Sequence, residues 1–376
     1  GIGLGVLSKG PVILVFTLPA ALLAPIWWAP AESRVRVGVW NWYLMLGAAF
    51  VAGAGVALAW AIPAAISGGE EFARAIFLGQ TTGRIAGSFS HGRPFWGYLP
   101  MQLALLFPWI LWPTLWRGLG AADWRRDPGM RFAAVWFIAS FLILSSFTDK
   151  QPHYFLAAIP AFALLAGRAL TTVSTFEAPS WATVLPLLPT GVVGVALVVL
   201  SLRPDIAIDL AGDTPLTIGN ETMIAGAAIL VAIVIGLGVV GRQVGRQVYV
   251  LAVVSTVAVV ALHLSFGTSA ANLYDVREPA QRLRAIAGAG RAVAHVGKYH
   301  GQFHYLGRLE APLSVISGDE VLAWFEGNPD GVVVYLHRRR EDVADGTAIH
   351  VQAFRGRWLA IWDRAGAGIA PEIFKR

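Results

Sequence analysis

The chain has 376 residues, of which 56% are hydrophobic and only 14% are charged, with a mean hydropathy of +0.60. Soluble domains carry about 25% charged residues, so this composition excludes an ordinary soluble protein and predicts a chain solvated mostly by lipid. The net charge of +6 does not indicate nucleic-acid binding, because the basic residues fall in short loops between apolar runs and form no single basic face. Cysteine is absent, which excludes disulfides and thiolate chemistry.

Eight apolar runs predict an α-helical polytopic membrane protein. A helix needs roughly 20 apolar residues to cross the bilayer core, and each run approaches that length. In chain order they are residues 11–28, 40–62, 98–116, 132–147, 154–170, 181–200, 223–240 and 248–266.

The loops between these runs alternate in charge, and this alternation predicts the orientation. Arginines gather after the first, third, fifth and seventh runs, for example Arg34, Arg125 and Arg242. Positive charge beside a span marks its cytoplasmic end. The loops at 63–97, 148–153 and 203–221, and the chain after residue 266, are therefore expected outside the cytoplasm.

The composition changes near residue 268, which predicts a membrane region over 1–267 and a small extracytoplasmic α/β domain over 268–376. Residues 277–287 have the pattern of an amphipathic helix, and Ser317 is placed to cap a helix that runs through Trp324. Strands are expected at 292–296, 313–316 and 331–336, and a hairpin at 349–354 and 358–362. This tail has no glycine-rich phosphate loop and no zinc-type spacing of histidines.

Two segments at predicted outer span ends carry basic residues beside turn or aromatic residues. Lys9 precedes Gly10-Pro at the first span, and His91 and Arg93 precede Pro-Phe-Trp-Gly-Tyr at the third. Arginine offers phosphate a bidentate fork, and histidine offers a metal ligand or an acid–base group. The structural alternative is that both cations extend to the headgroups, while the aromatic residues around Tyr98 form part of an interfacial belt.

A third segment, the turn at 148–154, is crowded with ionisable side chains. Asp149, Lys150, His153 and Tyr154 lie within six residues between two spans. A turn requires polar residues but not this density of charge, and ionisable residues at a membrane edge indicate function. The turn is therefore the strongest candidate for a site.

The order of these motifs resembles that of a known family. The chain reads Gly5-Val-Leu-Ser-Lys-Gly-Pro, then His91-Gly-Arg-Pro-Phe-Trp-Gly-Tyr-Leu-Pro, then Asp149-Lys-Gln-Pro-His-Tyr-Phe-Leu. These segments are similar to signatures of polyprenyl-phosphate-dependent GT-C glycosyltransferases. That group includes the dolichyl-phosphate-mannose–protein mannosyltransferases and the lipid A aminoarabinose transferases. The likeness covers roughly residues 1–175, as the C-terminal part of such a protein.

The resemblance implies transfer of a sugar from a polyprenyl-phosphate donor to a lipid, glycan or protein acceptor at the outer face of the inner membrane. Lys9, Arg93, Lys150 and Tyr154 would then hold the donor phosphate. His91 matches a position near the active site of the aminoarabinose transferases that can contribute to a site for a divalent metal, and His153 shares the crowded turn. The family's catalytic base is an acidic residue in a loop that would precede Gly1, so no catalytic base is assigned.

Two other classes of function fit the apolar runs. A secondary transporter or flippase with an appended domain predicts ionisable residues at mid-bilayer and repeated halves. The runs hold few ionisable residues, chiefly His263 and the end-placed Arg168, and their loops do not repeat. An envelope scaffold protein remains open, although it leaves the crowding around Lys150 unexplained.

Overall fold

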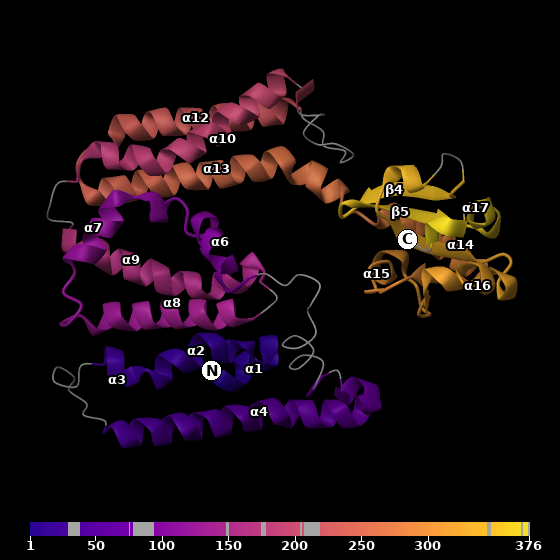
Figure 1. Ribbon diagram of the computed structural model, residues 1–376, viewed down its shortest axis with the longest axis horizontal. Helices are drawn as coiled ribbons and strands as arrows, with labels where there is room; N and C mark the ends of the chain where they lie inside the picture. Colours follow the sequence, from indigo (N-terminus) through magenta and orange to yellow (C-terminus); the bar gives the residue numbers. More distant parts are fainter. Residues whose placement is uncertain are drawn as a thin grey trace. The chain divides into compact units, whose positions relative to one another are not determined.

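The computed structural model describes residues 1–28, 38–74, 76–77, 94–147, 150–173, 178–203, 205–206, 219–343, 347–369 and 371–374. These residues form two compact units, each described here by itself. The first is Gly1–Thr190 with Ile233–Ser255, and the second is Gly191–Ala232 with Thr256–Arg376. The first unit is helical, whereas the second combines helices with one β-sheet (Figure 1).

Within the described residues, seven helical segments are long and apolar enough to cross a membrane. They are Ile2–Leu22, Val39–Glu70, Pro128–Ser146, Pro152–Val173, Ser180–Leu202, Asn220–Val239 and Val244–Gly267. Each overlaps one of the predicted runs, so the polytopic helical fold class is confirmed.

The predicted span at 98–116 is wrong. Its residues form α6 (Tyr98–Leu105), a 3₁₀ turn η5 (Trp109–Leu111) and the start of α7 (Pro113–Ala121). Neither α6 nor α7 is long enough to cross a bilayer. Pro108 and Pro113 lack an amide hydrogen, so a continuous helix breaks between them, and Pro113 takes the first-turn position where proline is tolerated.

The first span begins earlier than predicted and is interrupted. It consists of α1 (Ile2–Lys9), η1 (Gly10–Val12) and α2 (Ile13–Leu22), with α3 (Ala24–Trp27) after it. Gly10 has a φ of 74°, a left-handed conformation that glycine adopts without strain, and it ends α1. Lys9 therefore lies at a break inside the span and not at its end.

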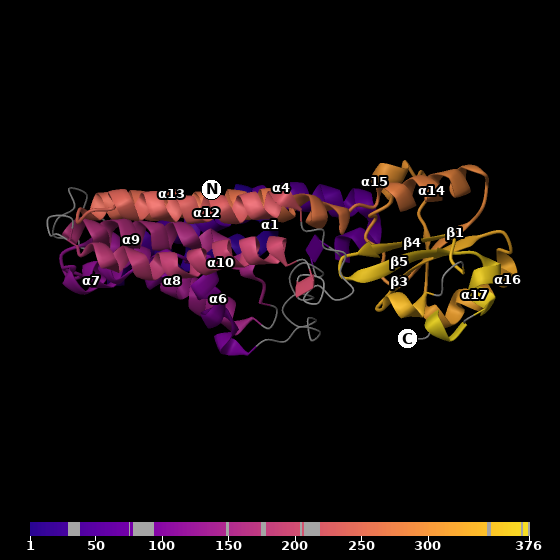
Figure 2. The ribbon, with the colours of Figure 1, turned by 90° about the horizontal axis from the view of Figure 1, so that it is seen from above.

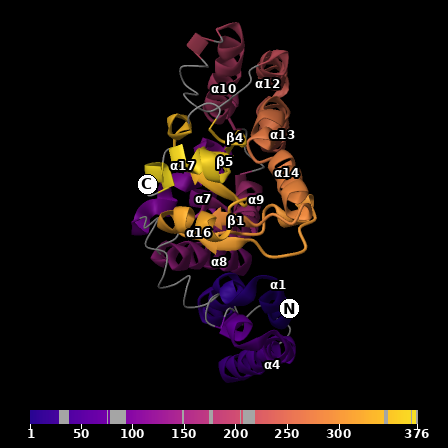
Figure 3. The same cartoon turned by 90° about the vertical axis from the view of Figure 1, so that its right-hand side faces the viewer.

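Helix α1 packs against α4 (Val39–Arg74), and Figure 3 shows the two side by side. A Cβ atom on Gly3 would lie 2.9 Å from the carbonyl oxygen of Gly53, so the contact requires glycine at that position. Within α4, Gly69 has a φ of 79° and separates the span from the last turn, Glu70–Arg74.

Helices α8 (Pro128–Ser146) and α9 (Ile159–Val173) pack as a hairpin joined through the 3₁₀ segment η6 (Pro152–Ala158). The carboxylate of Asp127 accepts a hydrogen bond from the amide of Met130 (3.0 Å) and so caps α8. Arg168 of α9 forms an ion pair with the same carboxylate (2.5 Å). Helix α8 also packs against α2 and α3, which places the hairpin at the centre of the first unit.

The last three spans are η7 (Ser180–Thr183) with α10 (Val184–Leu202), α12 (Asn220–Val239) and α13 (Val244–Asn272). In the second unit, a Cβ atom on Gly226 would lie 2.6 Å from the carbonyl oxygen of Gly194, so α10 and α12 meet at small residues. Ser265 of α13 donates a hydrogen bond to Thr222 of α12 (3.0 Å), a polar link between two spans.

The C-terminal part of the second unit is a small α/β domain. The predicted helix, strands, hairpin and Ser317 cap all occur with small shifts of boundary. Its strands are β1 (Val293–Val296), β2 (Ser314–Ile316), β3 (Val332–His337), β4 (His350–Phe354) and β5 (Arg357–Trp362). Its helical elements are α14 (Arg277–Gly288), α15 (His304–Gly307), η8 (Gly318–Glu320), α16 (Val321–Gly327), η9 (Arg340–Asp342), α17 (Arg364–Ile369) and η10 (Pro371–Phe374).

The five strands follow the order β2-β1-β3-β5-β4. Strand β1 is parallel to β2 and β3, whereas β5 is antiparallel to β3 and β4. One face buries Leu283 of α14 and Phe303, and the other buries Phe325 of α16 and Ala367 of α17. The domain is therefore a three-layer sandwich with helices on both faces of the sheet (Figure 2).

Candidate functional site

A buried apolar cluster in the first unit joins the segments that carry the three predicted motifs. We refer to it as the aromatic cluster. Its buried members are Phe16, Tyr98, Leu144, Phe155 and Ala158, and its partly buried members are Val12, Val15, Met101, Leu105, Phe137, Phe141, Phe147 and Tyr154. Each motif-bearing segment contributes a residue to this cluster. These residues are Val12, Tyr98 and Tyr154, which follow Lys9, Arg93 and Lys150 by no more than five positions. Their packing brings the three segments together.

Lys150 lies at the end of the α8–η6 connection and is only 3% exposed. Its Nζ donates a hydrogen bond to the carbonyl of Phe147, at the C-terminal end of α8. Burial lowers the pKa of Lys150 below its usual range, because desolvation disfavours the charged ammonium. A lysine held in this way gains more from pairing with an anion than an exposed lysine does.

Tyr154 and His153 lie on η6 beside Lys150. Tyr154 is half-buried against the aromatic cluster, and His153 is exposed. Their rings meet edge to face, with centroids 4.4 Å apart. An imidazole and a phenol therefore follow the buried lysine in the chain, three and four residues after it, and contact each other.

Tyr98 is a residue that sequence reasoning missed, since it was grouped with the interfacial aromatic residues. The side chain is fully buried, whereas Phe95 and Trp96 are more than half exposed and fit the belt. Its hydroxyl donates a hydrogen bond to the carbonyl of Gln151 (3.1 Å), the residue after Lys150. Tyr98 thus fixes the backbone of the Lys150 turn to α6.

Gln102 lies one helical turn after Tyr98 on α6 and is also missed by the sequence motifs. It is 5% exposed, and neither its amide nitrogen nor its amide oxygen has a hydrogen-bond partner among the described residues. Its position in an apolar run is the sequence signal that could have marked Gln102 as a candidate, because burying an amide without hydrogen-bond partners is costly.

The remaining predicted site residues are less tightly placed. Lys9 is exposed at the C-terminal end of α1, where the helix dipole favours a cation. His91, Arg93 and Asp149 lie outside the described residues. The described part of the chain has no group of three or more His, Asp or Glu side chains that could hold a metal ion. The possible metal at His91 gains no support from these residues, and no chemical step is derived through a metal.

Comparison with known proteins now adds to this geometry. No protein-family model matches the chain. It is 32% identical over 172 residues to an undecaprenyl phosphate-α-4-amino-4-deoxy-L-arabinose arabinosyl transferase of Pseudomonas fluorescens, a match covering 45% of this chain and 29% of that protein. The corresponding transferase of Pseudomonas aeruginosa is 32% identical over 174 residues, with the same two coverages.

Two solved structures of ArnT from Cupriavidus metallidurans share the fold. The form bound to undecaprenyl phosphate superimposes with a TM-score of 0.59 at 19% identity, covering 96% of this chain and 67% of ArnT. The apo form gives a TM-score of 0.60 at 17% identity, covering 97% of this chain and 67% of ArnT. The fold is ArnT-like, of the GT-C type. The resemblance seen in the sequence is confirmed, while the matches to the curated relatives extend over less than a third of their length.

Proposed function

We propose that this protein is an integral-membrane glycosyltransferase. It moves a sugar from a polyprenyl-phosphate donor to a lipid acceptor at the outer face of the inner membrane. The observation that carries the proposal is the buried Lys150 beside Tyr154, on a turn that the aromatic cluster joins to the other two motif-bearing segments. The activity for which the relatives are named supports aminoarabinose as the sugar, and the resemblance to lipid A aminoarabinose transferases supports lipid A as the acceptor.

The reaction needs a cation where the leaving group develops its charge. The acceptor hydroxyl oxygen forms a bond to the anomeric carbon as the bond from that carbon to the donor phosphate oxygen breaks. The hydroxyl proton passes to a base, and none of the described residues is assigned that role. Preorganised donors stabilise the departing phosphate most strongly in a site that excludes water. Lys150 meets this requirement, since its ammonium is already desolvated.

The other predicted residues complete this proposal. Tyr154 would donate its hydroxyl proton to a phosphate oxygen, and Lys9 and Arg93 would supply further positive charge. His91 and His153 would border the sugar. The membrane region is proposed to comprise residues 1–267, and the α/β domain, residues 268–376, is proposed to lie on the outer side with the donor site.

The direct test uses the protein reconstituted in proteoliposomes with a radiolabelled polyprenyl-phosphate sugar and a lipid A acceptor. Transfer of label to the acceptor is expected from the unmodified protein and is expected to be lost in the double variant Lys150→Ala, Tyr154→Phe. Lys298→Ala is the matched control, because Lys298 is an exposed lysine of the α/β domain. Undiminished transfer by the double variant would show that these residues do not hold the donor.

A further inference from the structure

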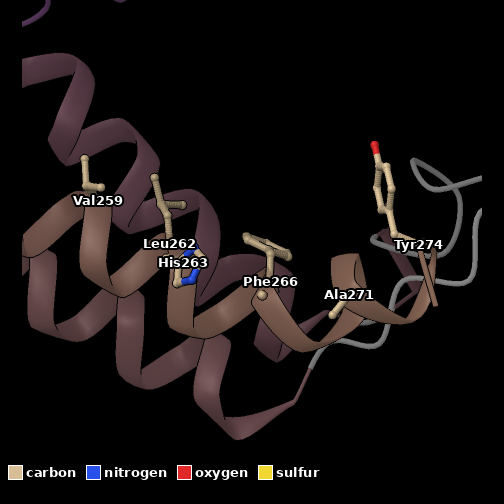
Figure 4. Close-up of a pocket in the computed structure, with 7 residues that line it drawn as sticks. Val259, Leu262, His263, Phe266, Ala271 and Tyr274 are labelled. Atoms are coloured by element: carbon tan, nitrogen blue, oxygen red, sulfur yellow. The ribbon is translucent and has the colours of Figure 1, made fainter. Parts of the chain in front are cut away.

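Helix α13 carries an apolar groove near its C-terminal end (Figure 4). It has a volume of about 590 Å³, and its described lining includes Val259, Leu262, His263, Phe266, Ala271 and Tyr274. Val259, Leu262 and Phe266 recur at spacings of three and four residues and so form one stripe along the helix, with His263 beside it. Figure 4 shows Val259, Leu262, Phe266 and Tyr274 projecting from the same side of α13. The groove is shallow and open, and its apolar lining suits a hydrocarbon chain that lies along the helix.

The groove crosses the level at which a membrane changes from hydrocarbon to headgroup. The apolar span of α13 ends at Gly267. At 1.5 Å per residue, His263 lies about 6 Å below that end, and Tyr274 lies about 10 Å along the chain beyond it. His263 is exposed in the groove wall, where its imidazole can donate a hydrogen bond to a lipid ester carbonyl. Tyr274, which is 59% exposed, then reaches the headgroup layer.

A cation is fixed beside the upper end of this groove. The tip of the β4–β5 hairpin docks on the end of α13, where the amide of Arg355 donates to the carbonyl of Leu273 (2.9 Å). The Arg355 guanidinium carbon lies 5.3 Å from the ring centroid of Tyr274. Arg355 has a φ of 53°, a backbone conformation that is unfavourable for a residue with a side chain. An arginine at this position of the hairpin tip therefore carries a conformational cost that glycine would not.

The acidic groups near this arginine are engaged elsewhere. Asp275 forms an ion pair with Arg277 (3.7 Å), and Glu278 forms one with Arg282 (2.8 Å). Among the described residues no carboxylate forms an ion pair with Arg355, whose side chain is exposed. The hairpin tip therefore presents net positive charge at headgroup level.

We infer that the α13 groove and Arg355 together bind one anionic glycerophospholipid. An acyl chain lies along Val259, Leu262 and Phe266, and its ester carbonyl accepts a hydrogen bond from His263. The headgroup phosphate accepts hydrogen bonds from Arg355. This lipid site lies wholly within the second unit and is independent of the donor site around Lys150. It predicts that an anionic headgroup is preferred over a zwitterionic one.

Photo-crosslinking tests this site in the intact chain in nanodiscs. The probes are phosphatidylglycerol and phosphatidylcholine, each with a diazirine on an acyl chain. The region between Arg246 and Arg277 contains neither Lys nor Arg, so one tryptic peptide holds the whole groove. Labelling of that peptide is expected to be stronger with phosphatidylglycerol. Loss of one charge-assisted contact in Arg355→Ala should reduce it about tenfold. Ala271→Phe, which fills the groove at an exposed position, should also reduce it.

Arg357→Ala is the matched control, because it removes an equal charge from the same hairpin away from Tyr274, and its labelling is expected to stay unchanged. Three results would overturn the inference. They are equal labelling by the two lipids, labelling in Arg355→Ala that equals the control, and labelling of α4 or α10 peptides as strong as that of the groove peptide. The last result would indicate ordinary annular lipid.

Discussion

The two ends of the α8–α9 hairpin handle charge in opposite ways. At one end, Arg168 forms an ion pair with Asp127, the residue that caps α8. Burial raises the pKa of Asp127, but the hydrogen bonds from Arg168 and the Met130 amide outweigh it and leave the pKa below its usual value. At the other end, Lys150 is 3% exposed, and burial lowers its pKa.

This difference separates a structural charge from a functional one. The Asp127–Arg168 pair neutralises itself, and the arginine side chain is still 60% exposed. The ammonium of Lys150 is instead buried, and desolvation shifts its pKa toward the neutral form. One hairpin thus fixes its fold at one end and, in the proposed function, offers a cation to the donor phosphate at the other.

The largest expected effect comes from removing the buried cation. Lys150→Met should lower the transfer rate on the order of 100-fold, the cost of losing one preorganised donor to a developing charge. Arg168→Gln should leave the rate within about threefold, because it stabilises only the far end of the hairpin. Rates in proteoliposomes at saturating donor measure both. Equal losses of transfer rate in Lys150→Met and Arg168→Gln would contradict the distinction between a functional charge at one end of the hairpin and a structural charge at the other.

A smaller effect is expected from pH. In the proposed function the donor phosphate binds the charged form of Lys150. Its affinity should then fall as pH rises through the lowered pKa of this lysine, below the usual value of about 10.4. Stability without donor should change in the opposite direction. Between the folded and unfolded pKa values the unfolded chain binds more protons, so rising pH favours the fold.

Lys150→Arg provides the control for this pH effect, because arginine stays charged throughout the range. Binding of polyprenyl phosphate measured by equilibrium dialysis should then lose its alkaline decline. A decline that persists unchanged in Lys150→Arg would mean that a different group titrates.

Hydropathy predicted the membrane spans well, since a helix in lipid must be apolar along its whole length. It could not predict the break in the 98–116 run, where composition remains apolar while Pro108 and Pro113 interrupt the hydrogen bonds. The strand pattern of the α/β domain was predicted with small boundary shifts, because alternating faces and turn residues determine such elements locally.

The candidate site shows the limit of sequence patterns more clearly. The motif at 148–154 indicated Lys150 and Tyr154, but not that one residue would be buried and the other half-buried. Trp96 lies just before α6 and Tyr98 begins it, yet Tyr98 is fully buried and Trp96 is 63% exposed. Which aromatic residue faces protein and which faces lipid depends on packing between segments far apart in the chain.

The smallest expected effect lies at the neutralised end of the hairpin. Asp127→Ala removes a helix cap and should lower the free energy of unfolding by about 1 kcal/mol. Asp127→Asn keeps a capping oxygen but not the charge, so it should lower the free energy of unfolding by less.

Because the folded pKa of Asp127 is lowered, its charge stabilises the protein above the unfolded pKa of about 3.9, and this contribution is lost as pH falls through the folded value. Melting temperatures in detergent, measured from about pH 3 to about pH 7, report the loss of the cap and the loss of the charge, because this range spans the usual carboxylate pKa. If Asp127→Asn and Asp127→Ala melt alike at neutral pH, the ion pair with Arg168 and not the cap stabilises this end of the hairpin.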